Sequence, residues 1–149
     1  MKTTFPIGVF GIIRDDEGRI LLCLRNDYAL RNLPGGGVES GESPWQAMIR
    51  EVKEETGLDV EITKLVGVYT KSNKDDVVFS FECKVISWEI TLNEEAQEIK
   101  YFAFQDFPKN TVPKQVERVK DFLESKSDTA IMKIQTSPSS IDLVKEGKL

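Results

Sequence analysis

The chain has 149 residues, a length that suits one domain able to bury a core of its own. Hydrophobic residues make up 40% and charged residues 30%, which argues against both a disordered chain and a membrane protein. The 20 Lys and Arg against 25 Asp and Glu leave a net charge of −5, which disfavours a nucleic-acid polymer as partner. No histidine is present, so Ser-His-Asp and Cys-His catalysis and imidazole-bound metals are excluded. Acid–base chemistry must therefore use carboxylates, Lys, Tyr or Cys.

The cysteines and the apolar segments indicate the cellular location. Cys23 and Cys83 lie far apart inside apolar runs, so we expect two buried, reduced thiols. The N-terminal residues lack the apolar segment of a signal peptide, and no stretch reaches the roughly 18 apolar residues of a membrane span. We therefore predict a cytoplasmic protein with no membrane partner.

The first 37 residues have the pattern of two strands followed by a loop. Residues 5–13 and 19–24 are rich in aliphatic and aromatic side chains, and the Asp-Asp-Glu-Gly turn between them predicts a β-hairpin. The chain then reaches Leu33-Pro34-Gly35-Gly36-Gly37, where three glycines allow close approach of the backbone. Taken alone, this glycine run is more often a turn than a binding site.

A helix is predicted directly after this loop. Ser43 is an N-cap, Pro44 occupies the first helical position and Gln46 completes a capping box, while Gly57 ends the helix. One apolar stripe is expected to face the core and consists of Trp45, Met48, Ile49 and Val52.

The second half of the chain is predicted to be mostly β-structure. Residues 60–69, 77–86 and 99–104 favour strands, and residues 113–125 favour an amphipathic helix. Residues 1–125 would form a single domain, followed by a loosely attached tail, 126–149, with a short strand at 131–134.

Three carboxylates project from one side of the predicted helix, namely Glu51, Glu54 and Glu55. Such like-charged neighbours cost roughly 0.2–0.5 kcal/mol per pair, and the C-terminal end of a helix dipole disfavours them further. A solvated acidic surface is one explanation. A divalent cation such as Mg²⁺, which prefers oxygen ligands and bridges carboxylates to phosphates, is the other.

Beginning at Gly36, the sequence reads G-x5-E-x7-R-E-V-x-E-E-x-G-L, which resembles the Nudix box in every position. Such a coincidence is expected about once in 10⁸ random windows. The resemblance to MutT-like Nudix hydrolases covers this box, Gly36–Leu58, firmly and residues 5–123 more loosely. It implies an α/β fold in which a mixed β-sheet lies between helices, as an α/β/α sandwich.

The resemblance also implies an activity and a set of roles. The reaction would be hydrolysis of a pyrophosphate bond in a nucleoside triphosphate, or in a nucleoside diphosphate linked to another group, with Mg²⁺ or Mn²⁺. Glu54 and Glu55 would be the main metal ligands, Glu51 a further ligand or the base, and the Gly36 carbonyl an additional oxygen ligand. Arg50 would orient Glu51, and Glu42 would brace the loop.

Many members of the family use another glutamate, outside the box. The acidic segment 93–98 offers Glu95, which we favour as a catalytic residue, and Glu98 as a metal ligand. A plain surface role for these charges is the alternative.

Substrate contacts and assembly are the remaining sequence predictions. Arg25, at the end of the second strand, would clamp a phosphate, and Tyr28, Phe79 and Phe81 offer stacking surfaces for a base. A surface ion pair and core packing are the respective alternatives. The predicted partner is a nucleotide-type small molecule, bound by a monomer or homodimer. A nucleotide sensor without turnover is the competing function, which the complete box disfavours.

Overall fold

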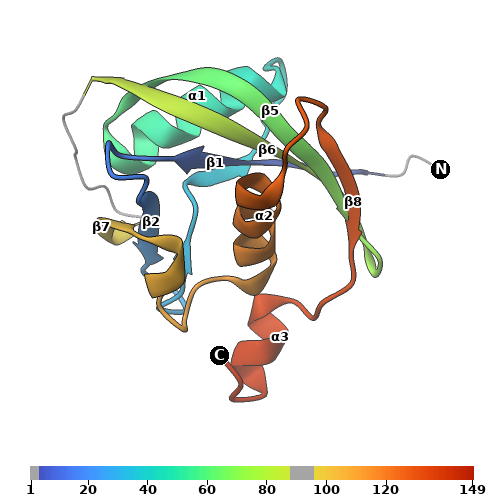
Figure 1. Ribbon diagram of the computed structural model, residues 1–149. Coiled ribbons are helices and arrows are strands. Elements are labelled where there is room, and N and C mark those ends of the chain that lie inside the picture. The colour runs from blue at the N-terminus through green and yellow to red at the C-terminus, as the bar shows by residue number, and fades with distance from the viewer. Residues whose placement is uncertain (1–3, 88–95) are drawn as a thin grey trace.

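The computed structural model describes residues 4–87 and 96–149 (Figure 1). Its elements in chain order are β1 (Ile7–Ile13), β2 (Ile20–Arg25), β3 (Arg31–Asn32), β4 (Gly35–Gly37), α1 (Pro44–Thr56), β5 (Asp59–Lys71), β6 (Lys74–Ser87), β7 (Ala96–Phe102), a 3₁₀ turn (Phe104–Asp106), α2 (Pro113–Glu124), β8 (Ile131–Gln135) and α3 (Ser140–Lys145). The predicted strands of the second half and the second helix are confirmed.

The strands form two sheets. A five-stranded mixed sheet has the order β4-β1-β6-β5-β8, and a three-stranded antiparallel sheet has the order β3-β2-β7. Alternate residues of β1 face opposite sides of the larger sheet: Val9 packs in the core with Met48 of α1, whereas Ile12 packs with Val119 of α2. The two helices therefore cover opposite faces, as Figure 1 shows, and the predicted α/β class with a mixed sheet between helices is confirmed.

The predicted hairpin between the first two strands is wrong. Beyond a single bridge between Arg14 and Ile20, β1 and β2 diverge into different sheets. The local turn does form, with Gly18 at φ 79°. However, β1 is paired with β4 on one side and with β6 on the other, so it has no free edge for β2.

Helix α1 has the predicted ends but a different buried face. The Ser43 hydroxyl accepts a hydrogen bond from the Gln46 amide at 3.2 Å, the reciprocal bond of the capping box is 2.8 Å, and Gly57 adopts φ 77°. Trp45 and Ile49 are 58% and 40% exposed, so the prediction that they face the core is wrong. The buried side of the helix instead comprises Ala47, Met48, Glu51, Val52, Glu55 and Thr56. Two carboxylates therefore lie on the face that packs toward the sheet.

The C-terminal segment joins the larger sheet. The predicted strand is β8, which pairs in parallel with β5, and Gln135 at its end is 1% exposed. At this strand the expectation of a loosely attached tail is not met, because the hydrogen bonds of the sheet extend past residue 125. The division of the chain at residue 125 stays a prediction.

Two further sequence expectations concern the thiols and the membrane. Cys23 and Cys83 are free and buried, and burial raises the pKa of the Cys83 thiol to about 12. Within residues 4–87 and 96–149, no helix is both long and apolar enough to cross a bilayer.

Candidate active site

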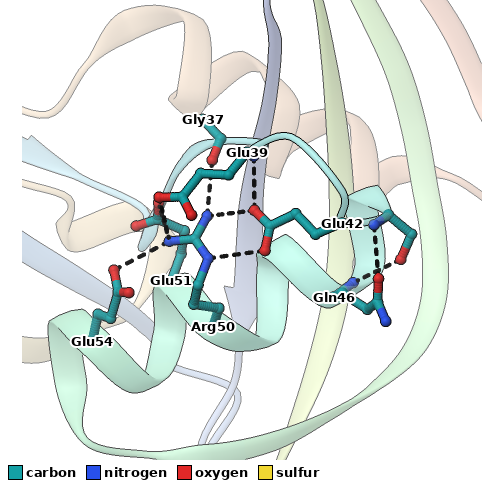
Figure 2. A network of polar contacts seen from close by, with 8 residues as sticks. Gly37, Glu39, Glu42, Gln46, Arg50, Glu51 and Glu54 are labelled. Atoms are coloured by element: carbon teal, nitrogen blue, oxygen red, sulfur yellow. Dashed lines mark hydrogen bonds and ion pairs between the residues drawn. The ribbon is translucent and has the colours of Figure 1, made fainter.

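The guanidinium of Arg50 is the centre of the polar network on α1 (Figure 2). Its Nε and Nη2 donate to the two carboxylate oxygens of Glu42 at 3.0 and 2.6 Å. Its Nη1 donates to Glu51 at 3.1 Å and to Glu54 at 3.2 Å. Nη2 also donates to the Gly37 carbonyl at 3.0 Å. One side chain thus ties the glycine loop, the segment before the helix and two helical carboxylates together.

These contacts have a clear electrostatic effect. The hydrogen bond from Arg50, with that from the Glu39 amide, lowers the pKa of the Glu42 carboxyl from 4.5 to about 2. In return, Glu42 and then Glu51 raise the pKa of Arg50. The positive charge at the centre of the network offsets the repulsion expected among neighbouring carboxylates. The predicted contact of Arg50 with Glu51 is present, although Glu42 is the bidentate partner.

The absence of a side chain on Gly36 allows Glu51 to pack against β4. A Cβ on Gly36 would lie 2.6 Å from Oε1 of Glu51, and a Cβ on Gly35 would lie 2.0 Å from the Val9 carbonyl oxygen. Neither glycine has a positive φ. Close approach of other atoms, and not a special backbone conformation, therefore requires glycine at both positions.

A cavity of about 480 Å³ opens beside this loop. Glu55 forms part of its wall, is 7% exposed, and accepts a hydrogen bond from the Gly35 amide at 3.2 Å. The cavity is bounded by strands of both sheets and by the start of α2. The lining residues are Phe10, Cys23, Arg25, Asn26, Asp27, Asn32, Gly35, Gly36, Glu55 and Gln115.

Several lining residues were not predicted as site residues from the sequence, among them an aromatic ring and two carboxamides. Phe10 supplies the aromatic wall, Asn32 donates to the Leu33 carbonyl at 2.9 Å, and Gln115 Oε1 accepts from the Leu33 amide at 2.6 Å. The Oδ1 atom of Asn32 is buried and has no hydrogen-bond partner among the described residues. Phe10 and Gln115 have no local signal, because only the packing of β1 and α2 brings them to the cavity.

Of the residues predicted to contact the substrate, only Arg25 lines the cavity. Arg25 lines the cavity and forms an ion pair with Asp27. Tyr28 is 42% exposed and is not among the lining residues. Phe79 and Phe81 stack on each other, 6.2 Å apart, within the core beneath α1. Their side chains point to the face of the sheet opposite Phe10, so they are not brought to the cavity.

Of the two glutamates predicted outside the box, the structure describes only Glu98. Glu98 accepts a hydrogen bond from Arg31 at 3.0 Å, which holds it to the three-stranded sheet. Glu95 lies outside the described residues.

The carboxylates of α1 fit a divalent cation in their chemistry. Within the described part of the chain, no three Asp, Glu, His or Cys side chains are already gathered as a metal site. Yet Nη1 of Arg50 lies within hydrogen-bond distance of both Glu51 and Glu54, so these carboxylates already share one positive charge. Their oxygens, with those of Glu55, are the hard donors that Mg²⁺ and Mn²⁺ prefer.

Comparison with known proteins decides the family. The sequence matches the NUDIX domain family over residues 4–122. The chain belongs to this family. The resemblance inferred from the box is therefore confirmed.

Named relatives and a solved structure agree with this assignment. The chain is 36% identical over 110 residues to a protein of Methanocaldococcus jannaschii named ADP-ribose pyrophosphatase, a match covering 69% of this chain and 64% of the relative's length. It is 30% identical over 140 residues, 93% of this chain and 94% of the other, to a Bacillus subtilis protein with the provisional name 8-oxo-dGTP diphosphatase. The crystal structure of a NUDIX hydrolase from Nitrosomonas europaea shares the fold with a TM-score of 0.81 and 24% identity, covering 92% of this chain and 82% of that one.

Replacing Gly36 should separate Glu51 from the glycine loop. We expect Gly36→Ala to lower the free energy of unfolding by about 1–3 kcal/mol, because the new methyl group and the Glu51 carboxylate cannot both stay in place. Gly37→Ala is the matched control, since nothing lies within 4 Å of a Cβ at that position. Urea denaturation measures both, and equal stabilities of the two variants would contradict the close approach.

Acid should weaken the Arg50 network in a defined range. The pKa of Glu42 is depressed in the folded protein, so its contribution to stability is complete above its ordinary value of 4.5 and is lost as the pH falls toward about 2. The difference in free energy of unfolding between wild type and Glu42→Gln should therefore shrink over this range. Urea denaturation at a series of pH values checks it, and a constant difference would refute the assignment.

Proposed function

We propose that the protein is a divalent-metal-dependent pyrophosphohydrolase that acts on a nucleoside triphosphate or on a nucleoside diphosphate linked to another group. The observation that supports this most is the row of carboxylates on α1: Glu51 packs beside Gly36, Glu54 shares Arg50 with it, and Glu55 forms part of the wall of a cavity large enough for part of a nucleotide. The names of the M. jannaschii and B. subtilis relatives both describe hydrolysis of nucleotide derivatives. The M. jannaschii match spans less than two thirds of that relative, so the substrate is not carried over from its name.

The metal would be held by Glu51, Glu54, Glu55 and the Gly36 carbonyl oxygen. When bound, Mg²⁺ or Mn²⁺ supplies positive charge to the diphosphate oxygens and makes water a better nucleophile. Glu54 is the carboxylate with the most room to move, since its side chain is 52% exposed and those of Glu51 and Glu55 are buried. Arg50 keeps its two bonds to Glu42 when Glu54 turns away, so the loop and helix stay joined.

Proton transfer requires an acceptor among the carboxylates, because the chain has no histidine. Glu51 is held in place by Arg50 at 3.1 Å and packs beside Gly36, so its carboxylate is the proposed proton acceptor. Glu95 remains the predicted alternative for this role, and Glu98 a predicted ligand.

Contacts with the rest of the substrate follow from the cavity. Arg25 would exchange its ion pair with Asp27 for a phosphate, and a base would lie against Phe10. The unpaired Oδ1 of Asn32 would accept a hydrogen bond from a base N–H, which relieves a buried acceptor that otherwise costs about 1–3 kcal/mol. Tyr28, next to Asp27 in the sequence, remains a predicted stacking surface.

Other predictions for the whole protein remain open to test. We retain a cytoplasmic location, a monomer or homodimer, and the absence of a nucleic-acid polymer as partner. A nucleotide sensor without turnover is the competing function, and no residue of the box has been lost to favour it.

A screen for the nucleotide products of hydrolysis, separated by chromatography, tests the proposed activity. Nucleoside triphosphates, ADP-ribose, dinucleoside polyphosphates and nucleotide sugars are incubated with the protein and with Mg²⁺, Mn²⁺ or a chelator. We expect turnover of at least one class, lost with the chelator. Binding of a nucleotide in calorimetry without hydrolysis under any condition would instead identify a sensor.

Glu54→Gln tests the metal-binding role directly. We expect turnover to fall by about 100-fold or more, because a neutral amide no longer offers charge to a cation. Stability should change by only about 0.3–0.5 kcal/mol, because the lost pair with Arg50 is an exposed one.

Glu39→Gln is the matched control for this experiment. Glu39 also faces Arg50, at 3.8 Å, but its side chain is 72% exposed and is not one of the proposed ligands. It should keep wild-type turnover. Full activity of Glu54→Gln would remove Glu54 from the metal site.

A further inference from the structure

The segment after α2, residues 125–149, lies beyond the family match at residues 4–122. It is hydrogen-bonded to the first turns of that helix. Gln135, at the end of β8, is 1% exposed. Its Oε1 accepts a hydrogen bond from Nε of Arg118 at 3.0 Å, and its Nε2 donates to the Lys114 carbonyl at 2.9 Å. The Lys114 ammonium in turn donates to the carbonyls of Ser137 and Pro138. Buried hydrogen bonds therefore run in both directions between α2 and the segment around Gln135.

The same turns of α2 carry the wall of the cavity. Gln115 follows Lys114, lines the cavity and accepts the Leu33 amide at 2.6 Å. The Arg118 guanidinium lies 5.4 Å from the ring centroid of Phe10, the aromatic residue of the cavity. Each of the two α2 residues held by Gln135 thus adjoins a residue that lines the cavity.

The start of α2 is also attached to β3, where the Val112 amide donates to the Arg31 carbonyl at 2.9 Å. Its N-cap, Val112, makes no side-chain capping bond. Arg118 is 3% exposed, its Nη1 has no hydrogen-bond partner among the described residues, and no ion pair to it is found there. A hydrogen bond to a charged, buried group is stronger than one between neutral groups, so the amide of Gln135 is a main contributor to the placement of Arg118.

We propose that Gln135 is a positioning residue for nucleotide binding, which holds Lys114 and Arg118 so that Gln115 and Phe10 keep the neutral wall of the cavity in shape. This inference rests on the proposed function. Because Gln135 acts on the wall formed by α2 and β1, and the carboxylates lie on α1, its loss should weaken binding and leave the chemical step unchanged. The segment after residue 125 is then part of the active unit.

Gln135→Leu tests the proposal, with Lys133→Ala as control. Lys133 lies on the same strand and contacts α2 through exposed ion pairs with Glu117 and Asp121. Its replacement therefore leaves the buried hydrogen bonds of Gln135 in place. In Gln135→Leu, we expect hydrogen exchange of the Leu33 amide to become about tenfold faster, with the Val52 amide of α1 unchanged. KM for the nucleotide that the wild type hydrolyses in the screen described above should rise about tenfold, and kcat should stay within about twofold.

The outcomes separate this inference from the proposed function. Unchanged Leu33 exchange, or faster exchange with unchanged KM, overturns the role of Gln135 while turnover by the wild type still upholds the hydrolase. If the wild type hydrolyses no nucleotide of the screen described above, the proposed function fails, and Kd values of ADP-ribose and dGTP from calorimetry replace KM. If Gln135→Leu does not fold, Gln135→Glu decides, because it keeps an oxygen, now charged, for Arg118 and replaces the donor to the Lys114 carbonyl by an acceptor. A smaller change in the same direction is expected, since only the contact with Lys114 is lost.

Discussion

One positive charge placed among carboxylates is the interaction on which the site depends. Four glutamates lie within reach of Arg50, and without it their mutual repulsion would favour spreading into solvent. The planar guanidinium can bond two oxygens of Glu42 and still reach Glu51, Glu54 and the Gly37 carbonyl, which a lysine ammonium with three donors cannot reproduce. The loop, the start of α1 and its carboxylates are therefore held as one unit before any metal or substrate arrives.

Two different walls meet at the cavity. The charged wall comes from a continuous stretch of sequence, because the glycine loop and α1 are neighbours in the chain and Gly36 leaves room for Glu51. The neutral wall is assembled from β1, β3 and α2, which are far apart in the sequence, and it contains an aromatic ring and two carboxamides. This division suits a diphosphate joined to a base: the first wall would take the charged part and the second the part on which selectivity depends.

The sequence predicted those features of the structure that depend on residues close together in the chain. The capping box at Ser43, the end of the helix at Gly57 and the spacing of the carboxylates were all readable, because each is fixed within one or two helical turns. The choice of strand partners is not local, so the hairpin of β1 with β2 was wrong. Which aromatic residue reaches the cavity depends on the face to which each strand residue points: Phe10 lines the cavity, whereas Phe79 and Phe81 pack with the core. Gln115 and Gln135 gain their contacts only through packing of α2 and β8.

The most direct test of this account is the affinity for Mn²⁺, measured by titration calorimetry in the presence of a nucleotide, for wild type and Arg50→Lys. If Arg50 organises the carboxylates, the lysine variant should remain folded and bind the ion about 10- to 100-fold more weakly, as is usual when a residue supporting metal ligands is changed. Equal affinity in the two proteins, or no binding of the ion by the wild type, would contradict it.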